Sequence, residues 1–508
     1  MNRGNFFRRT LLTLLTVSIL LFATVVGAKI QMYTATGEDY PSAAESQDIS
    51  KQRALDKAIK KATKQAGVYL KTYSRSVNSE LTDDEVTAIT SNAWQLVGEP
   101  KFTREIINHS DDTQIIVWKA TVEVNVDDSE IQSWIKRDDK NKSTIISQTR
   151  DANKASDENE RKIEDLREKY NRATSQDEKD KIRIQINKSD NEFLAIQKLE
   201  EGNKLAYVKN YNEAIKLYNE AIQLKPNYAE AYYNRGTAYA QNKQYELAIK
   251  DLDKAIQIKP NDSEQYTNRG IVYSDLGNFL QAISDYDKAI KLNPNLFEAY
   301  INRGVTYSQS KQYELAIQDY NKAIQLNPNS AETYNNRGNA YQRLKQYDVA
   351  IKDYEKALQL NPSYSNARYN CAIAYFQLGM IYGKNLGKYE QSIQYFSKAI
   401  QLNPNFVDAY CNRGNVYSFL KQYEQAIQDY SKAIQIKPDE AVIYNNLGSS
   451  YNHIGQYEKA IQCFSKAIQL NPNYANAYNN RGIIYRKLGE ETKAQADFKK
   501  AKQLGYKG

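Results

Sequence analysis

The chain has 508 residues, of which 41% are hydrophobic and 26% charged, a balance typical of a folded globular protein and not of a disordered one. Its formal net charge of +8 comes from interleaved Lys and Glu residues, and the concentrated basic stripe that nucleic-acid binding needs is absent. The odd number of cysteines, 3, excludes a disulfide framework.

The first 28 residues have the features of a secretory signal peptide. Three arginines precede the apolar run 11–26, and the small residues at 26–28 suit a signal peptidase. We therefore predict cleavage after Ala28 and a mature protein that is periplasmic, extracellular or otherwise associated with the bacterial envelope. An uncleaved membrane anchor is the alternative, because the run is close to the shortest length that spans a bilayer. No cysteine lies near the cleavage site, which excludes a lipoprotein anchor.

Residues 29–138 are predicted to form a small α+β domain. One helix places Ala54, Ala58 and Ala62 on a single face, toward a core. Asp83, Asp84 and Glu85 stand where a second helix starts, a position at which acids act as caps. The predicted elements are a strand near 29–35, a helix near 49–73, a helix from Thr82, and strands near 101–108 and 113–126, joined by the polar turn 109–112.

Two segments of this domain carry a resemblance to a known family. Gln-Ala-Gly-Val-Tyr-Leu at 65–70 follows the alanine-spaced helix, and Leu-Thr-Asp-Asp-Glu-Val stands at 81–86. The domain resembles the small exported domain at the N-terminus of flagellar-assembly-T-like periplasmic proteins. The resemblance implies export and a role in assembly or in the envelope.

Residues 139–194 are charged and predict a helical linker, either a hairpin or a short coiled coil. Ile163, Leu166, Tyr170 and Ala173 have heptad-like spacing. The run Ser-Gln-Asp-Glu at 175–178 is a capping box that restarts a helix.

Residues 195–508 repeat with a period of 34 residues, interrupted by one interval of 42. Such a period indicates a helical solenoid. Proline recurs at Pro226, Pro260, Pro294, Pro328, Pro362, Pro404, Pro438 and Pro472, and a small residue at Gly202, Gly236, Gly270, Gly304, Gly338, Ala372, Gly414, Gly448 and Gly482. The small residues give nine repeats.

Each repeat predicts two amphipathic helices closed by the proline, whose ring and missing N–H end the second helix. The recurring segments are Tyr-Asn-Arg-Gly-x-x-Tyr, Tyr-x-x-Ala-Ile, Lys-Ala-Ile and Asn-Pro-Asn. Over residues 195–508 this pattern resembles the tetratricopeptide repeat (TPR) family. The expected fold is thus mainly α: a TPR solenoid preceded by the small α+β domain and the helical linker.

Two repeats depart from the pattern. The sixth has eight extra residues around 380–387, which predict a lengthened first helix or hairpin loop. The ninth places Gln495 and Lys502 where earlier repeats have apolar residues, which indicates a terminal cap.

An arginine precedes the small residue in six repeats, and each of these repeats has an aspartate sixteen residues later. Where the arginine is replaced, the aspartate is replaced too. We therefore predict an ion pair that joins the two helices of a repeat. The pairs are Arg235–Asp251, Arg269–Asp285, Arg303–Asp319, Arg337–Asp353, Arg413–Asp429 and Arg481–Asp497, and the replacements are Glu201 with Leu217, Cys371 with Tyr395 and Leu447 with Cys463.

Asparagine stands two residues before the small residue in eight repeats: Asn234, Asn268, Asn302, Asn336, Asn370, Asn412, Asn446 and Asn480. The family resemblance implies that this site faces the inner groove, where a row of carboxamides can pair with the N–H and C=O of an extended polypeptide. Hydrogen bonds between neighbouring helices are the alternative role. Acids on the same helices, Glu230, Glu264, Glu298, Glu332 and Asp408, would favour basic segments.

We expect no catalytic activity and no cofactor or metal. His109 and His453 are the only histidines, neither has a metal or triad partner at suitable spacing, and no glycine-rich phosphate loop occurs. The predicted function is a protein-interaction scaffold with a protein or peptide partner and no small-molecule substrate. A structural spacer and a surface-displayed, adhesin-like protein are the alternatives.

Overall fold

The computed structural model describes residues 30–39, 41, 45–76, 81–96, 99–108, 114–127, 139–385 and 387–506. The predicted signal peptide and the turn 109–112, with His109, lie outside these residues. The chain divides into two compact units, Met1–Pro260 and Asn261–Gly508, called here the N-terminal and C-terminal units.

The N-terminal unit begins with an antiparallel sheet built on one long strand, β4 (Gln114–Asp127). Strand β1 (Ile30–Asp39) pairs with one edge of β4. Strands β2 (Trp94–Leu96) and β3 (Lys101–Asn108) share the other edge. The predicted strands correspond to β1, β3 and β4, whereas the short β2 was not predicted.

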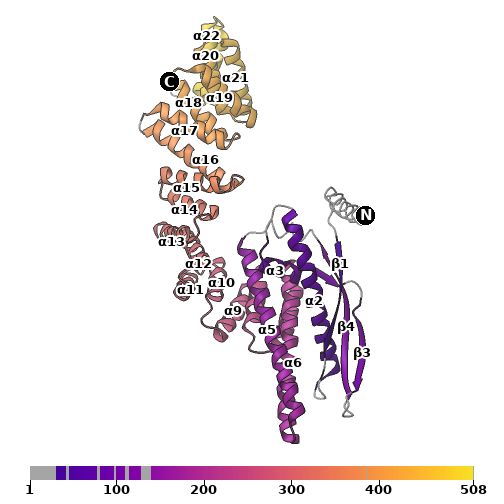
Figure 1. Ribbon diagram of the computed structural model, residues 1–508. Helices are drawn as coiled ribbons and strands as arrows, with labels where there is room; N and C mark the ends of the chain where they lie inside the picture. Colours follow the sequence, from indigo (N-terminus) through magenta and orange to yellow (C-terminus); the bar gives the residue numbers. More distant parts are fainter. Residues whose placement is uncertain are drawn as a thin grey trace, which may run out of the picture. The chain divides into compact units, whose positions relative to one another are not determined.

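Helix α2 (Gln47–Ser76) lies against one face of this sheet (Figure 1). Its buried Ala54, Ala58 and Ala62 pack with apolar residues of β1 and β4. The approach is so close that a Cβ on Gly37 of β1 would lie 2.3 Å from the carbonyl oxygen of Ala54. Small residues on both elements are therefore what allows the helix and the sheet to touch.

Helix α3 (Asp83–Ala93) starts at a capping box. The Glu85 N–H donates to Thr82 Oγ1 (3.2 Å), and the Thr82 N–H donates to Glu85 Oε2 (2.9 Å). The predicted capping role of Glu85 is confirmed.

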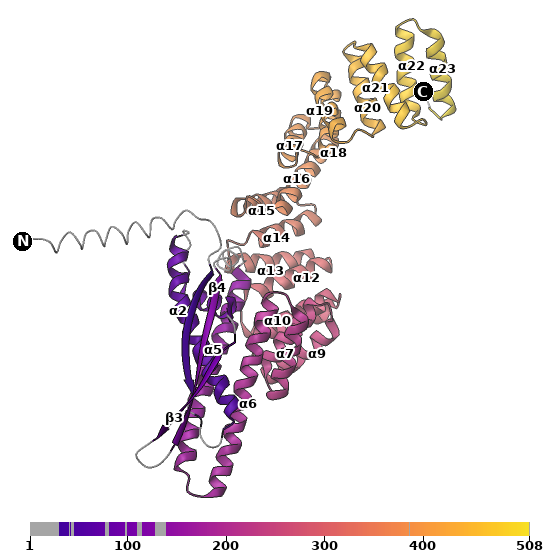
Figure 2. The ribbon, with the colours of Figure 1, turned by 90° about the vertical axis from the view of Figure 1, so that its right-hand side faces the viewer.

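Helices α5 (Asp139–Arg172) and α6 (Gln176–Tyr207) form a hairpin (Figure 2). The Glu178 N–H donates to Ser175 Oγ at the restart, as predicted. Leu166, Tyr170 and Ala173 pack against residues of α6 between the two helices.

The hairpin lies in the same compact unit as the sheet and the first repeats. Helix α6 continues without interruption through the expected boundary at 194/195, and its second half is the first helix of the first repeat. Ion pairs join α2 to both helices of the hairpin, from Arg53 to Asp190 of α6 and from Lys57 to Glu160 of α5.

That packing centres on a buried ion network. Arg167 of α5 donates to Asp39 (2.9 Å) and Glu45 (2.6 Å), and Arg53 of α2 pairs with Glu45 and with Asp190 of α6. The side chains of Asp39 and Glu45 are at most 1% exposed. Burial opposes ionisation of Asp39, but Arg167 outweighs it and holds the pKa of that carboxyl below its usual value.

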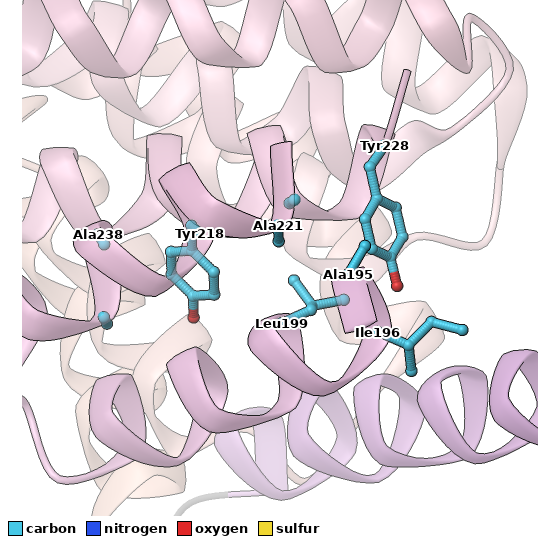
Figure 3. Packing of buried hydrophobic residues seen from close by; sticks show 9 residues of the cluster. Ala195, Ile196, Leu199, Tyr218, Ala221, Tyr228 and Ala238 are labelled. Atoms are coloured by element: carbon cyan, nitrogen blue, oxygen red, sulfur yellow. The ribbon is translucent and has the colours of Figure 1, made fainter. Parts of the chain in front are cut away.

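The first repeats complete the N-terminal unit, with α7 (Tyr211–Leu224), α8 (Ala229–Gln241) and α9 (Tyr245–Ile258). Figure 3 shows Leu199 of α6 close to Tyr218 and Ala221 of α7. Ala155 of α5 packs on the same cluster. The hairpin therefore covers the first repeat, as a preceding repeat would.

The C-terminal unit is a series of helix pairs. They are α10 (Ser263–Asp275) with α11 (Phe279–Leu292), α12 (Phe297–Gln309) with α13 (Tyr313–Leu326), α14 (Ala331–Arg343) with α15 (Tyr347–Leu360), α16 (Ser365–Met380) with α17 (Tyr389–Leu402), α18 (Val407–Phe419) with α19 (Tyr423–Ile436), α20 (Ala441–His453) with α21 (Tyr457–Leu470), and α22 (Ala475–Lys487) with α23 (Glu491–Gln503). The mainly α solenoid is confirmed.

The extra residues of the sixth repeat lengthen its first helix. Helix α16 continues into a π-helical turn, η1 (Ile381–Asn385). In this repeat a Cβ on Gly379 would lie 2.6 Å from the Phe396 ring, as a Cβ on Gly304 would lie 2.7 Å from the Tyr320 ring in the fourth repeat. Ala372, the predicted small residue of the sixth repeat, is buried.

Candidate functional site

The first helices of the repeats in the C-terminal unit make up what is called here the inner face. Helices α10, α12, α14 and α16 contact one another in sequence, as do α18, α20 and α22. Contacts between consecutive second helices are sparser. The lengthened α16 separates the two series, because α18 does not pack on it as closely.

The predicted arginine–aspartate pairs join the two helices of the six repeats that have them, and they are confirmed. In the fourth repeat Arg303 donates through Nε and Nη2 to both oxygens of Asp319, at 2.8 and 2.6 Å. The other pairs have the same two-bond geometry. The side chains of Arg303 and Asp319 are only 18% and 7% exposed, so the pairs are more buried than surface ion pairs.

The arginines also make contacts that the comparison of the repeats did not predict. Arg303 lies over the rings of Tyr300 and Tyr307, and its third nitrogen, Nη1, pairs with Asp287 in the second helix of the preceding repeat. Equivalent bonds link Arg235 to Asn219, Arg337 to Asn321, Arg413 to Ser397 and Arg481 to Ser465. A polar residue sixteen positions before each of these arginines is the signal that could have indicated this contact.

Where the pair is replaced, the substitutes lie together in apolar surroundings. Cys371 and Tyr395 belong to one cluster, and Leu447 and Cys463 to another. The predicted apolar replacement is confirmed in both repeats.

The predicted asparagines lie on first helices, Asn234 on α8 of the N-terminal unit and the others on the inner face of the C-terminal unit, and several of them bond to the preceding repeat. The bonds run from Asn234 Nδ2 to Asn203 (2.8 Å), from Asn370 Nδ2 to Asn339 (2.9 Å) and Asn335 (3.2 Å), from Asn446 Nδ2 to Asn415 (3.2 Å), and from Asn480 Nδ2 to Asn445 (3.0 Å). Helix-to-helix bonding, the alternative role, is therefore present at these four sites. Their carboxamide nitrogens are already used within the protein.

The remaining asparagines differ. Asn412 Nδ2 donates to the backbone carbonyl of Asp408 in its own helix (2.8 Å), and Asn336 Oδ1 accepts a long bond from its neighbour Asn335 (3.4 Å). Asn302 Nδ2 is screened from solvent and has no hydrogen-bond partner among the described residues. Asn268, in contrast to Asn302, has an interaction partner.

The predicted acids lie one turn before the asparagines. Glu230 pairs with Lys259, while Glu264 and Glu332 are exposed and Glu298 is half-buried. In the part of the chain that the structure describes, Glu298 and Glu332 form no ion pair. The middle of the inner face thus combines carboxylates with partly used carboxamides, a surface that attracts cations and N–H donors.

A second charged cluster lies where α2 meets the first repeat, and sequence analysis did not predict it. Lys60 pairs with Asp56 of α2 (3.2 Å), and Glu200 and Lys204 of α6 lie near enough to act on these charges. Burial raises the pKa of Glu200 and lowers that of Lys204. Residues so far apart in sequence leave no periodic signal.

The cysteines behave as buried apolar residues. Burial raises the pKa of Cys371 and Cys411 to about 12 and that of Cys463 to about 11, so the thiols stay protonated at neutral pH. His453 stacks on Tyr423 with ring centroids 4.5 Å apart. Within the described residues, no group of His, Cys, Asp or Glu is arranged to hold a metal ion.

Five family models described as TPR repeat or tetratricopeptide repeat match this solenoid. The matched segments are 202–243, 306–345 and 448–489; 329–405; 229–262, 263–296 and 407–440; 285–318 and 430–462; and 475–504. Together they span more than half of the chain. The chain belongs to the tetratricopeptide repeat family. Tetratricopeptide repeats are protein-interaction modules, and this array is a scaffold of that kind.

Several solved structures are similar to parts of this chain. The C-terminal part of a TPR repeat-containing protein from Cytophaga hutchinsonii is 20% identical, with 49% of this chain and 99% of that one covered and a TM-score of 0.43. A tetratricopeptide repeat protein from Parabacteroides merdae is 23% identical (48% and 93% covered, TM-score 0.29), and MamA from Desulfovibrio magneticus is 25% identical (34% and 94% covered, TM-score 0.28). None of the curated proteins matches the chain.

Across the described residues, no helix has the combination of length and apolar character that crossing a membrane requires.

Proposed function

We propose that this TPR protein is a non-enzymatic scaffold of the bacterial envelope that binds an extended polypeptide segment along its inner face. The observation that carries the proposal is the row of asparagines and acids on consecutive first helices. Carboxamides recognise a peptide backbone without regard to its side chains, and the acids add a preference for Lys or Arg.

Charge reversal on the inner face tests this proposal. The double variant Glu298→Lys with Glu332→Lys should lose the preference for basic peptides, measured by retention on an array of immobilised extended peptides of varied charge. Glu314→Lys with Asp348→Lys is the matched control, because these exposed acids start the second helices of the same two repeats. Peptide selection that is unchanged in the first variant, or equally changed in the control, would contradict inner-face binding.

The envelope location is part of the proposal. Its support is the arginine-flanked apolar run before Ala28 and the resemblance of residues 29–138 to an exported domain. N-terminal sequencing of the protein from its native host should find Lys29 as the first residue. An intact N-terminus on protein recovered from the cytoplasm would contradict export.

A further inference from the structure

In the fourth repeat, tyrosine rings and carboxylates surround one guanidinium group. Arg303 lies 5.8 Å from the centroid of the Tyr300 ring and 5.9 Å from that of the Tyr307 ring. It pairs with Asp319 of its own repeat and with Asp287 of the preceding repeat. Ring faces and carboxylates suit a guanidinium group, because both attract its positive charge and the group is flat enough to lie on a ring.

The sixth repeat keeps a carboxylate in the matching place but has no arginine to pair with it. Glu355 stands sixteen residues before Cys371, as Asp287 stands before Arg303. Glu355 is exposed and, in the part of the chain that the structure describes, forms no ion pair. The eighth repeat also lacks the arginine, but it has Ser431 at this place. Of these two repeats, only the sixth therefore presents an acid without a cationic partner.

Three tyrosines gather beside Glu355. Tyr375 donates its hydroxyl to Glu355 Oε1 (2.6 Å), and burial together with this hydrogen bond raises the pKa of Tyr375, so the phenol stays protonated at neutral pH. Its ring centroid lies 6.2 Å from that of Tyr395, which replaces the aspartate of the pair. Tyr395 in turn meets Tyr382 edge to face, with centroids 5.0 Å apart. The three tyrosines are half-buried and Glu355 is exposed, so a ligand can reach the group.

The added turns of the sixth repeat bring Tyr382 to this place. Gly379 approaches an aromatic ring of the second helix as Gly304 does in the fourth repeat. Tyr375 stands four residues before Gly379, and Tyr382 stands three residues after it. The two tyrosines that flank the arginine of the fourth repeat have the same spacing from Gly304. Leu378 takes the place of the arginine between them, and it is buried and uncharged.

One cation of the protein itself lies near these rings. Lys388 Nζ is 5.6 Å from the centroid of the Tyr382 ring. Among the described residues, no lysine or arginine lies over the rings of Tyr375 and Tyr395, and Lys388 does not pair with Glu355. The carboxylate and two of the three rings are thus available to a cation from elsewhere.

We infer that Glu355 and the three tyrosines, called here the tyrosine site, bind the guanidinium group of an arginine side chain from another polypeptide. The guanidinium N–H groups donate to Glu355, and the flat group lies against the tyrosine rings, as that of Arg303 does within the fourth repeat. An ammonium group fits less well, because it is a compact and strongly hydrated charge. The site is built by α15, α16, η1 and α17, and it does not depend on inner-face binding.

The probe is the peptide acetyl-Gly-Arg-Gly-amide, and its binding to the full chain is measured by saturation-transfer NMR during a titration. We expect a Kd of about 1 mM for a contact with one side chain. The same peptide with citrulline, which has the shape of arginine without the charge, should not bind. The lysine peptide should bind at least about threefold more weakly than the arginine peptide.

Two substitutions locate the contact. Glu355→Gln and Tyr382→Leu should each lower the affinity for the arginine peptide about fivefold. Glu355→Gln should leave the melting temperature unchanged because Glu355 is exposed, so it tests the site even if Tyr382→Leu does not fold. Glu390→Gln, at an exposed acid of α17 in the same repeat, is the matched control and should keep the affinity within about twofold.

Equal binding of the citrulline peptide, or an affinity that survives Glu355→Gln, would overturn the tyrosine site. The inner-face variant Glu298→Lys with Glu332→Lys separates this result from the proposed function. It should bind the arginine peptide as the original protein does. Loss of binding in this variant alone would place the arginine on the inner face, which would overturn the tyrosine site and leave inner-face binding standing.

Discussion

Arginine side chains join elements in both units, but most copies of the arginine–aspartate pair lie in the C-terminal unit. In the N-terminal unit Arg53 ties α2 to α6, and Arg167 ties α5 to β1, through contacts that occur once. In the C-terminal unit Arg303 makes the same contacts as its counterparts in other repeats. A repeated contact can be recognised from sequence because it is seen several times, whereas a single contact cannot.

The arginine–aspartate pairs and the network around Arg167 also differ in whether the chain contains an apolar substitute for them. The solenoid contains its own substitutions, such as Leu447 with Cys463, in which an apolar contact takes the place of the ion pair. The network around Arg167 occurs once, without such a substitute in the chain, and both of its buried carboxylates bond to Arg167. The N-terminal unit should therefore be the more sensitive of the two to loss of one charge.

The largest effect is expected from Arg167→Ala. It would leave Asp39 and Glu45 buried with their main cation removed, which should lower the free energy of unfolding of the N-terminal unit by about 3–5 kcal/mol. Tryptophan fluorescence during urea unfolding follows this unit selectively, because all 3 tryptophans lie within it.

Arg172→Ala, on the same helix, is the control. Its side chain is 80% exposed and pairs only with Glu168, so the change should stay within about 0.5 kcal/mol. If Arg167→Ala is as mild as this control, the buried network does not stabilise the unit.

A smaller effect is expected in the solenoid. Arg303→Leu alone should cost about 3 kcal/mol because it leaves Asp319 buried and unpaired. Adding Asp319→Cys reproduces the Leu447–Cys463 contact, and the double variant should return to within about 1 kcal/mol of the original protein. Burial raises the pKa of Asp319 even beside Arg303, which shows how much desolvation offsets the attraction of the pair. Thermal unfolding followed by far-UV circular dichroism measures both variants.

Reversing the Arg303–Asp319 pair tests the contact with the preceding repeat as well as the pair itself. Arg303→Asp with Asp319→Arg should recover less stability than the apolar pair, because an aspartate at position 303 would face Asp287. Full recovery in the reversed variant would mean that the contact with the preceding repeat contributes little.

The sequence predicted the fold best where it repeats itself. Nine copies located the helix pairs, and co-occurrence of arginine with aspartate identified a contact that the structure confirms. The ion pair between Arg53 and Asp190 spans 137 residues and has no second copy, so no pattern marked it. The sequence located the row of asparagines but did not show which of them bond to the preceding repeat, because the partner of each carboxamide depends on how one repeat packs on the previous one. The close approach of Gly379 to the Phe396 ring likewise depends on the added turns of α16, which sequence spacing does not place.

The smallest expected effect is a pH dependence confined to the N-terminal unit. Burial raises the pKa of Glu200 from its ordinary value of 4.5 to about 7, so between these values the folded protein holds a proton that the unfolded chain has released. The contribution of Glu200 to stability is therefore highest below about pH 4.5 and falls as pH rises to about 7. We expect a loss of about 1–2 kcal/mol across this window, less than the full pKa shift implies, because Glu200 is partly exposed and interacts with Lys204.

Glu200→Gln should remove this fall, since glutamine does not titrate, and should leave the N-terminal unit equally stable at both ends of the window. The exposed neighbour Glu201→Gln serves as the control and should keep the pH dependence of the original protein. Urea unfolding followed by tryptophan fluorescence at a series of pH values measures all three proteins. A slope that survives in Glu200→Gln would assign the titration to another carboxyl of the cluster, with Asp56 the nearest candidate, because burial raises its pKa too. The charged contacts of the solenoid are arginine–aspartate pairs that recur along the array. Glu200 and Lys204 instead belong to a charged cluster that occurs once. Of the two, only this cluster is expected to change its protonation near neutral pH.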